Sequence, residues 1–340
     1  MPLRPLFVLI AGLVMLFVAP AVQAASFDCS KARTEFAKAI CAHPDLSKAD
    51  EDLAAAFSTA LDGLSPPARA EVQGAQDAWV KFANIACTKN AKLARKPYDE
   101  DGISCLQSLF SDRTATLGNS KTIGGLRFYS IDRFAALADP DVRDDGITIA
   151  TKLVSTPRID GTDALAAAFN HYIETGIKDE IDPSIVTDVK AADGSEDDEN
   201  ALIVSAATDA RITMTLSSYS YGHGAAHGNP GTSFLHFLRT PMRPLAASDV
   251  FAADGWEGRL QVLALAGVKE AMGDGLMLDD PTSINDPVID PTRWDFSTDG
   301  LIIQFEPYEV APYAAGAPTI TIPWSKLDAD FAPGAEAIVK

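Results

Sequence analysis

Between residues 26 and 118, apolar side chains recur every three or four positions, which is the period of an amphipathic helix. Four helices are predicted there: a short one capped by Thr34, one over about 46–64, one from Ser65 to about Ala86, and one over about 103–117. Pro66 and Pro67 end the second helix and start the third, because proline is tolerated in the first turn of a helix. Residues 26–118 are therefore predicted to be a small all-α domain.

From residue 147 onward, short runs of β-branched and aromatic residues alternate with turn residues, a pattern typical of strands joined by hairpins. The predicted strands are Ile147–Pro157, Ala201–Ala207, Arg211–Tyr221, Ser233–Arg239, Trp294–Ser297, Leu301–Phe305 and Thr319–Ile322. Two long helices are predicted at about Asp163–Ile181 and Trp256–Met272. We therefore predict an α+β domain over 147–330, with a mainly antiparallel sheet packed by two helices and no implied parallel crossover.

Two acidic segments interrupt these patterns. Residues 119–146 mix apolar residues with an acidic cluster from Asp139 to Asp145, and they are predicted to link the two domains. Residues 188–200 are predicted to be an acidic loop with Glu196–Glu199 at its solvated tip. The spacing of these acids does not fit a calcium-binding loop.

The N-terminus has the pattern of a secretory signal peptide. Residues 1–24 contain Arg4, an apolar run from Leu6 to Ala19, and a small-residue cleavage site that ends at Ala24, with Ala25 as an alternative. The apolar run is too short to span a membrane comfortably. We therefore expect a periplasmic or secreted protein with no stable membrane insertion after cleavage.

The charge balance narrows the classes of partner. Removing residues 1–24 removes Arg4 and no acid, so the formal net charge of -19 becomes -20. This negative charge disfavours binding to nucleic acids and to anionic membranes and favours binding to a basic partner. A requirement for solubility alone would also explain the charge.

All four cysteines lie between residues 29 and 105. An even number in an exported protein indicates disulfides. Cys87 ends one predicted helix and Cys105 begins the antiparallel next one, so we predict a Cys87–Cys105 bridge, and by elimination Cys29–Cys41. The spacing fits neither a redox motif nor a zinc site.

Several short motifs then suggest a family for this domain. They are Phe27-Asp28-Cys29-Ser30-Lys31-Ala32, Ala39-Ile40-Cys41, Pro44-Asp45-Leu46, Asp50-x-Asp52-Leu53-x-x-Ala56-Phe57, Gln76-x-x-Trp79, Cys87 and Cys105-Leu106. Together they resemble the N-terminal domain of LprI-type lysozyme inhibitors over about 26–118. Glu35 and Ala37 stand where that family more often has proline and glutamate.

The second domain resembles the C-terminal domain of RsiV-type proteins over about 147–330. The matching motifs are Tyr219-x-Tyr221, Gly224-Ala225-Ala226-His227-Gly228, Leu245-x-x-x-Asp249-Val250-Phe251, and Phe305-x-Pro307-Tyr308-Glu309-Val310-Ala311-Pro312-Tyr313-Ala314-Ala315-Gly316. The resemblance implies a fold, and it offers a precedent for lysozyme recognition, because RsiV is a membrane-anchored anti-sigma factor that senses lysozyme. No segment after residue 24 resembles a membrane span. We therefore expect this chain to share the ligand recognition of RsiV-type proteins and not their signalling role.

The last of these motifs holds the candidate partner-binding residues. Three prolines stiffen the connection between Phe305 and Thr319, and tyrosines on a stiff loop form a recognition surface at low entropic cost. The alternative is a loop whose tyrosines pack on the core. The candidate residues are Pro307, Tyr308, Glu309 and Tyr313, together with Tyr221 and His227.

No pattern indicates catalysis. His223 and His227 are four residues apart, but the surrounding glycines indicate a loop, in which this spacing does not make a metal site. Nucleophile, phosphate-binding and dinucleotide motifs are absent from the sequence. Glu306 and Glu309 are interpreted as surface acids. We therefore predict no catalytic residues, no metal and no cofactor.

Three functions fit these observations. The first is an exported, non-enzymatic protein that binds or inhibits a basic, lysozyme-type cell-wall hydrolase. The second is an envelope protein that binds peptidoglycan or another cell-wall glycan. A hydrolase with an unrecognised site ranks last.

Overall fold

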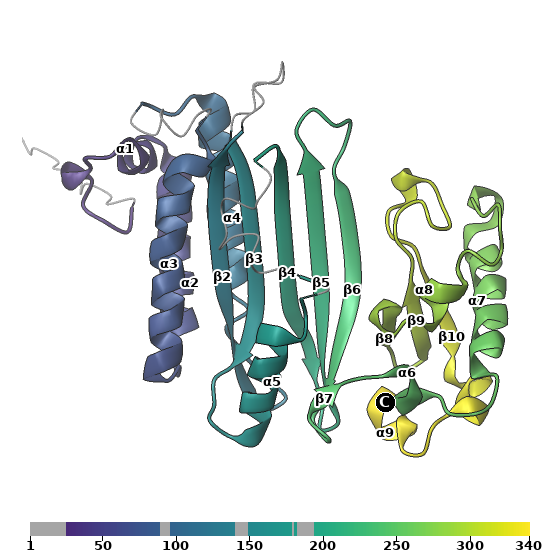
Figure 1. Cartoon of the computed structure of the whole chain (residues 1–340). Helices are drawn as coiled ribbons and strands as arrows, with labels where there is room; N and C mark the ends of the chain where they lie inside the picture. Colours follow the sequence, from purple (N-terminus) through teal and green to yellow (C-terminus); the bar gives the residue numbers. More distant parts are fainter. Residues whose placement is uncertain (1–24, 89–95, 140–148, 179, 182–193) are drawn as a thin grey trace, which may run out of the picture.

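The computed structural model describes residues 25–88, 96–139, 149–178, 180–181 and 194–340. A helical region is followed by a seven-stranded sheet and then by a three-stranded sheet with its own helices (Figure 1). Each part has its own buried hydrophobic cluster. The predicted signal peptide and residues 182–193 of the predicted acidic loop lie outside the described residues. No described helix is both long and apolar enough to cross a membrane.

The four predicted N-terminal helices are confirmed as α1 (Glu35–Ala42), α2 (Pro44–Leu61), α3 (Pro66–Ala86) and α4 (Glu100–Leu117). Polar side chains cap three of them: the side chains of Thr34, Ser65 and Asp99 each accept a hydrogen bond from a backbone N–H in the first turn. Both predicted disulfides, Cys29–Cys41 and Cys87–Cys105, are present.

The larger sheet has its strands in chain order and is almost entirely antiparallel. The strands are β1 (Thr122–Ile123), β2 (Leu126–Ala138), β3 (Ile149–Ile159), β4 (Glu196–Ala207), β5 (Arg211–Gly222), β6 (Asn229–Leu238) and β7 (Arg243–Pro244). β3 and β4 pair in parallel, and this pairing was not expected from the sequence. Helix α5 (Ala164–Thr175) lies in the β3–β4 connection and packs on one face of the sheet (Figure 1).

Part of the predicted 119–146 linker forms a strand, β2. After its first two residues β2 pairs antiparallel with β3, from Phe128 opposite Ile159 to Ala138 opposite Ile149. Tyr129 and Phe134 pack into the hydrophobic cluster formed by the four helices. These apolar residues therefore belong to the hydrophobic core and not to a linker. Residues 140–148, which hold most of the predicted acidic cluster, lie outside the described residues.

The second acidic run is also part of a strand and not a solvated loop tip. Glu196–Glu199 begin β4, where the carboxylate of Asp198 forms an ion pair with the buried Lys152 of β3. Asp197 accepts hydrogen bonds from the backbone N–H and the hydroxyl of Thr151. Partners on a neighbouring strand therefore compensate the burial of these carboxylates.

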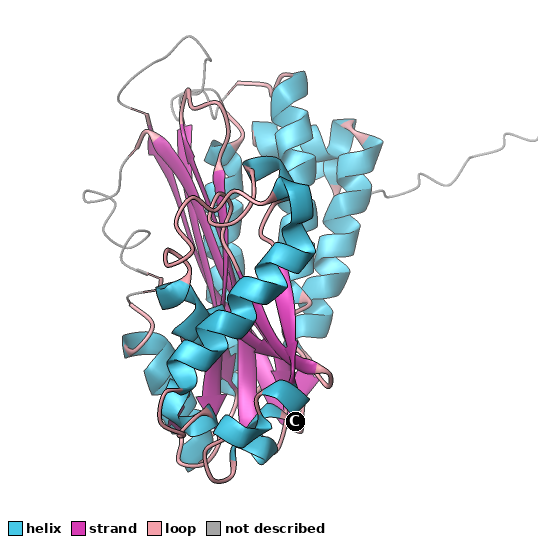
Figure 2. Ribbon diagram, turned by 90° about the vertical axis from the view of Figure 1, so that its right-hand side faces the viewer, coloured by secondary structure: helices cyan, strands magenta, loops and turns pink. Residues whose placement is uncertain are grey.

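The smaller sheet contains β8 (Trp294–Phe296), β9 (Gly300–Gln304) and β10 (Thr319–Pro323), and all its pairs are antiparallel. The long helix α7 (Trp256–Met272) crosses it, as Figure 2 shows, and three short helices complete this part: α6 (Ala247–Val250), α8 (Asn285–Ile289) and α9 (Ala335–Val339). The two predicted long helices are thus present, but each packs on a different sheet.

A buried ion pair joins the helical region to the larger sheet. Nη1 of Arg113 in α4 contacts Oδ2 of Asp132 in β2, and both side chains are almost completely buried. The other oxygen of Asp132 accepts a hydrogen bond from Ser155, at 2.7 Å. Nε of Arg113 donates to Gln76 of α3, at 3.0 Å. Gln76 belongs to the Gln-x-x-Trp motif, so one role of this motif is to position the arginine that reaches the sheet.

Replacing Asp132 with Ala should lower the free energy of unfolding by about 3–5 kcal/mol, because it leaves the Arg113 charge buried and unpaired. Asp52→Ala is the matched control: it breaks the solvent-exposed pair with Lys48 and should change stability little. Denaturant unfolding of the two variants measures the difference. Equal effects would show that the buried pair does not join the two regions.

A histidine connects the two sheets. His236 of β6 is fully buried, and its Nε2 donates to the carbonyl of Trp294 in β8, at 2.8 Å. Burial is the main reason that the pKa of His236 falls from 6.5 to about 4, and the nearby Arg211 lowers it further.

Stability should therefore fall as the pH drops from 6.5 to about 4, because the unfolded chain binds a proton in this range before the folded chain does. The size of the effect is about 3 kcal/mol. The free energy of unfolding is measured across this pH range for the wild type and for His236→Gln. The difference between the two profiles is the contribution of His236, because carboxylates titrate in both proteins. The variant should have the flatter profile, and parallel profiles would contradict this assignment.

Candidate functional site

Three aromatic side chains from distant segments meet at one place on the surface. The ring of His227 stacks on that of Tyr313 with 4.1 Å between centroids, and the ring of Tyr308 lies 5.5 Å from that of Tyr313. The Tyr308 hydroxyl is 3.5 Å from Nε2 of His227. We call His227, Tyr308 and Tyr313 the aromatic cluster. Three of the six predicted partner-binding residues therefore lie together.

A tight turn holds Tyr308 outward. The N–H of Glu309 donates to the carbonyl of Glu306, which closes a four-residue turn with Pro307 in its second position. Tyr308, in the third position, has a φ of 74°, a value that a type II turn requires and that normally selects glycine. Its side chain is 56% exposed. A tyrosine in this position combines backbone strain with an exposed ring, a combination found at functional sites.

Tyr313 anchors the cluster to the larger sheet. Its hydroxyl donates to the carbonyl of Gly228, at 2.7 Å, in the loop that joins β5 to β6. Gly228 allows the ring of Tyr219 to pack on this loop, because a Cβ at this position would lie 2.2 Å from the Tyr219 hydroxyl and would displace the ring. Tyr219 is itself 44% exposed, so it extends the aromatic surface beside the cluster.

Glu309 is held by the protein itself. Its carboxylate accepts hydrogen bonds from Arg293, at 2.9 Å, and from the N–H of Glu306, at 2.7 Å. Glu306 also lies within 3.5 Å of Arg293 and accepts a hydrogen bond from the N–H of Thr232 in β6. The two acids thus fasten the turn to its surroundings, which leaves the rings as the more available contact groups.

Tyr221 is not part of the cluster. Its hydroxyl donates to the carbonyl of Ala225 in its own loop, and its ring faces His223 at 6.2 Å. His227 also braces this loop through a contact of 3.0 Å between its Nδ1 and the carbonyl of Gly228. Pro307 contributes by shaping the turn that presents Tyr308.

His223 has a role that the sequence did not reveal. It is buried, with Nδ1 2.6 Å from Asp139 and Nε2 3.3 Å from Asp197. Asp139 also accepts a hydrogen bond from Ser195, at 3.0 Å. This cluster ties the end of β2 to β4 and to the His223 loop. In the described part of the chain, no three His, Cys, Asp or Glu side chains are arranged to hold a metal ion.

Comparison with known families finds one match in the N-terminal third of the chain and another in its C-terminal part. Residues 29–117 match the family described as lysozyme inhibitor LprI, and residues 248–325 match DUF3298, described as a protein of unknown function. The chain contains an LprI domain and a DUF3298 domain. DUF3298 is the RsiV-like C-terminal region, so both family resemblances are confirmed, the second over residues 248–325 of the predicted 147–330. The LprI match indicates a lysozyme-inhibitor-like protein and favours a non-enzymatic one.

Two solved structures are similar to the chain. A DUF3298 family protein from Pseudomonas aeruginosa PAO1 has 16% identity and a TM-score of 0.47, covering 64% of this chain and 98% of its own. A DUF3298 member from Bacteroides fragilis has 21% identity and a TM-score of 0.43, covering 62% of this chain and 96% of its own. Among curated proteins, none has significant similarity to this chain.

The strain at Tyr308 is open to a direct test. Tyr308→Gly and Tyr308→Ala both remove the ring, but only glycine adopts a positive φ without a steric penalty. The glycine variant should therefore be more stable than the alanine variant by about 1 kcal/mol, as measured by denaturant unfolding. An alanine variant of equal or greater stability would show that the turn relaxes and that no strain is stored.

Proposed function

We propose that this chain is an exported protein that binds a lysozyme-type cell-wall hydrolase and inhibits it. The observation that carries the proposal is the match of residues 29–117 to the LprI lysozyme inhibitors. The signal-peptide pattern of residues 1–24 and the two disulfides support export to an oxidising compartment.

The charge distribution favours the C-terminal part as the side that attracts a basic enzyme. Residues 29–117 contain 11 Lys and Arg against 12 Asp and Glu, so this domain is nearly neutral. Residues 118–340 contain 16 basic residues against 34 acidic ones. Opposite charge on a partner raises the rate of association and makes it depend on salt concentration.

The aromatic cluster is the proposed contact within this acidic part. Tyr308 offers an exposed ring on a turn that is already fixed, so binding costs little conformational entropy. Tyrosine is also enriched among the residues that contribute most to protein interfaces. In this arrangement Glu306 and Glu309 hold the turn in place, and Tyr308 makes the contact.

Association with a panel of lysozyme classes, measured at low and high salt, tests the proposal. Tyr308→Gly should weaken binding by about tenfold or more, the effect of removing an interface hot spot. Val80→Ala is the control, because it removes an exposed apolar side chain from the helical domain. Inhibition of cell-wall hydrolysis should decrease in parallel with affinity.

The opposite outcomes are also informative. Absence of binding to every lysozyme class at low salt would contradict the proposal. A loss with Val80→Ala but not with Tyr308→Gly would place the contact on the LprI domain instead.

A second candidate is a glycan-binding role, because exposed tyrosine rings also stack on sugars. Sedimentation with insoluble peptidoglycan distinguishes it: glycan binding that depends on Tyr308, without lysozyme binding, would support this alternative.

A further inference from the structure

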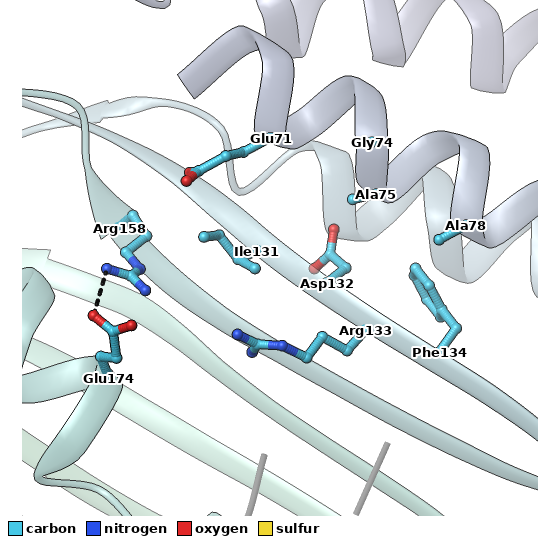
Figure 3. A pocket seen from close by; sticks show the side chains of 10 residues that line it. All are labelled: Glu71, Gly74, Ala75, Ala78, Ile131, Asp132, Arg133, Phe134, Arg158 and Glu174. Atoms are coloured by element: carbon cyan, nitrogen blue, oxygen red, sulfur yellow. Dashed lines mark ion pairs between the residues drawn. The ribbon is translucent and has the colours of Figure 1, made fainter. Parts of the chain in front are cut away.

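A hollow lies between the LprI domain and the larger sheet. Its lining residues are distant in sequence from the aromatic cluster. Its volume is about 570 Å³, within the range of sites for small ligands. Helix α3 forms one wall, β2 and the end of β3 form the other, and Glu174 of α5 closes one side (Figure 3). Neither family match covers β2 or β3, so nothing assigns this hollow a role.

Small residues on α3 keep the hollow open. Gly74, Ala75 and Ala78 face the strands, where larger side chains would fill the space. A Cβ built on Gly74 would meet no atom within 4 Å. Glycine inside a helix is less stable than alanine, and no packing contact here requires it.

Two arginines line the strand side, and their charges are poorly compensated. Arg133 is a partly buried residue, and among the described residues its guanidinium has no hydrogen bond and no ion pair. Nη1 of Arg158 donates to the carbonyl of Asn170, at 3.4 Å, and lies 3.7 Å from the carboxylate of Glu174. Its Nε is buried without a partner in the described structure. In Figure 3 the side chain of Arg133 extends along the strands toward the side where Arg158 lies.

The nearby acids do not compensate for these charges. Asp132 is paired with Arg113, and Glu71 accepts a hydrogen bond from the hydroxyl of Tyr129, at 2.6 Å. Ile131 and Phe134 form an apolar part of the wall of the hollow. The hollow therefore offers guanidinium donors at one side, an apolar wall at the other, and carboxylates at its rim that disfavour a multiply charged anion.

We propose that this hollow binds a small ligand that carries a single carboxylate, held by the guanidinium groups of Arg133 and Arg158. The planar fork of arginine matches the two oxygens of a carboxylate. The apolar wall receives the aliphatic part of the ligand, such as the side chain of a C-terminal peptide residue. Phosphate has the same recognition chemistry but a higher charge, so it serves as the competing probe.

Nuclear magnetic resonance titration of the full mature chain tests the site with three probes: N-acetyl-dialanine, its C-terminal amide, and inorganic phosphate. N-acetyl-dialanine should shift the resonances of Arg133 and Gly74 at millimolar concentration. The amide should not, because it lacks the charge. Arg133→Gln should lower the affinity by about ten- to a hundredfold, the loss expected for charge-assisted hydrogen bonds.

Two further variants separate binding from folding. Gly74→Leu should block the probe by filling the hollow, whereas Lys81→Gln, an equal loss of charge on the exposed face of the same helix, should leave binding unchanged. Arg133→Gln should not lower the melting temperature, because the arginine has no internal partner to lose.

The proposal is overturned if N-acetyl-dialanine produces no shift, if the amide binds equally well, or if Arg133→Gln and Gly74→Leu bind like the wild type. Phosphate binding without carboxylate binding would overturn the assignment of the ligand class.

Discussion

The arrangement of the whole molecule depends on how β2 is covered. Beyond its short pairing with β1, this 13-residue strand is the edge of the larger sheet, and an uncovered apolar edge invites aggregation. The helical domain packs against it, with Tyr129 and Phe134 in the helical core and the Arg113–Asp132 pair between them. Side chains of β2 therefore complete the core of the helical domain, so this domain packs directly on the sheet.

This packing gives the family motif a physical meaning. Trp79 packs edge-on against Phe110 and fills the helical core, while Gln76 accepts a hydrogen bond from Arg113 and so directs it toward the sheet. Both residues of the motif are therefore committed to structure in this chain. If the LprI domain contacts an enzyme directly, it must use other residues on its surface.

The two proposed binding sites differ in chemistry and in origin. The aromatic cluster is an exposed surface of three rings that bridges the two sheets, and it suits a large partner. The hollow beside Arg133 is concave and is lined by two arginines and three carboxylates, and it suits a small ligand that carries a single carboxylate. Small residues of α3 keep it open where the helix passes the strands, and its walls come from the LprI domain on one side and from strands outside both family matches on the other.

The sequence by itself determined the features that depend on neighbouring residues. Helical periodicity, the cap at Thr34, the helix start at Pro66, both disulfides, most strands and the proline-stiffened connection that holds Tyr308 were all predictable. Each of them follows from local spacing or backbone chemistry. Only the tertiary structure decided which charges are buried and paired. Asp132, Asp198 and His223 looked like ordinary loop or surface residues, and Arg133 gave no signal at all. Their roles depend on partners up to 84 residues away, as for His223 and Asp139, and no local pattern records such a partner.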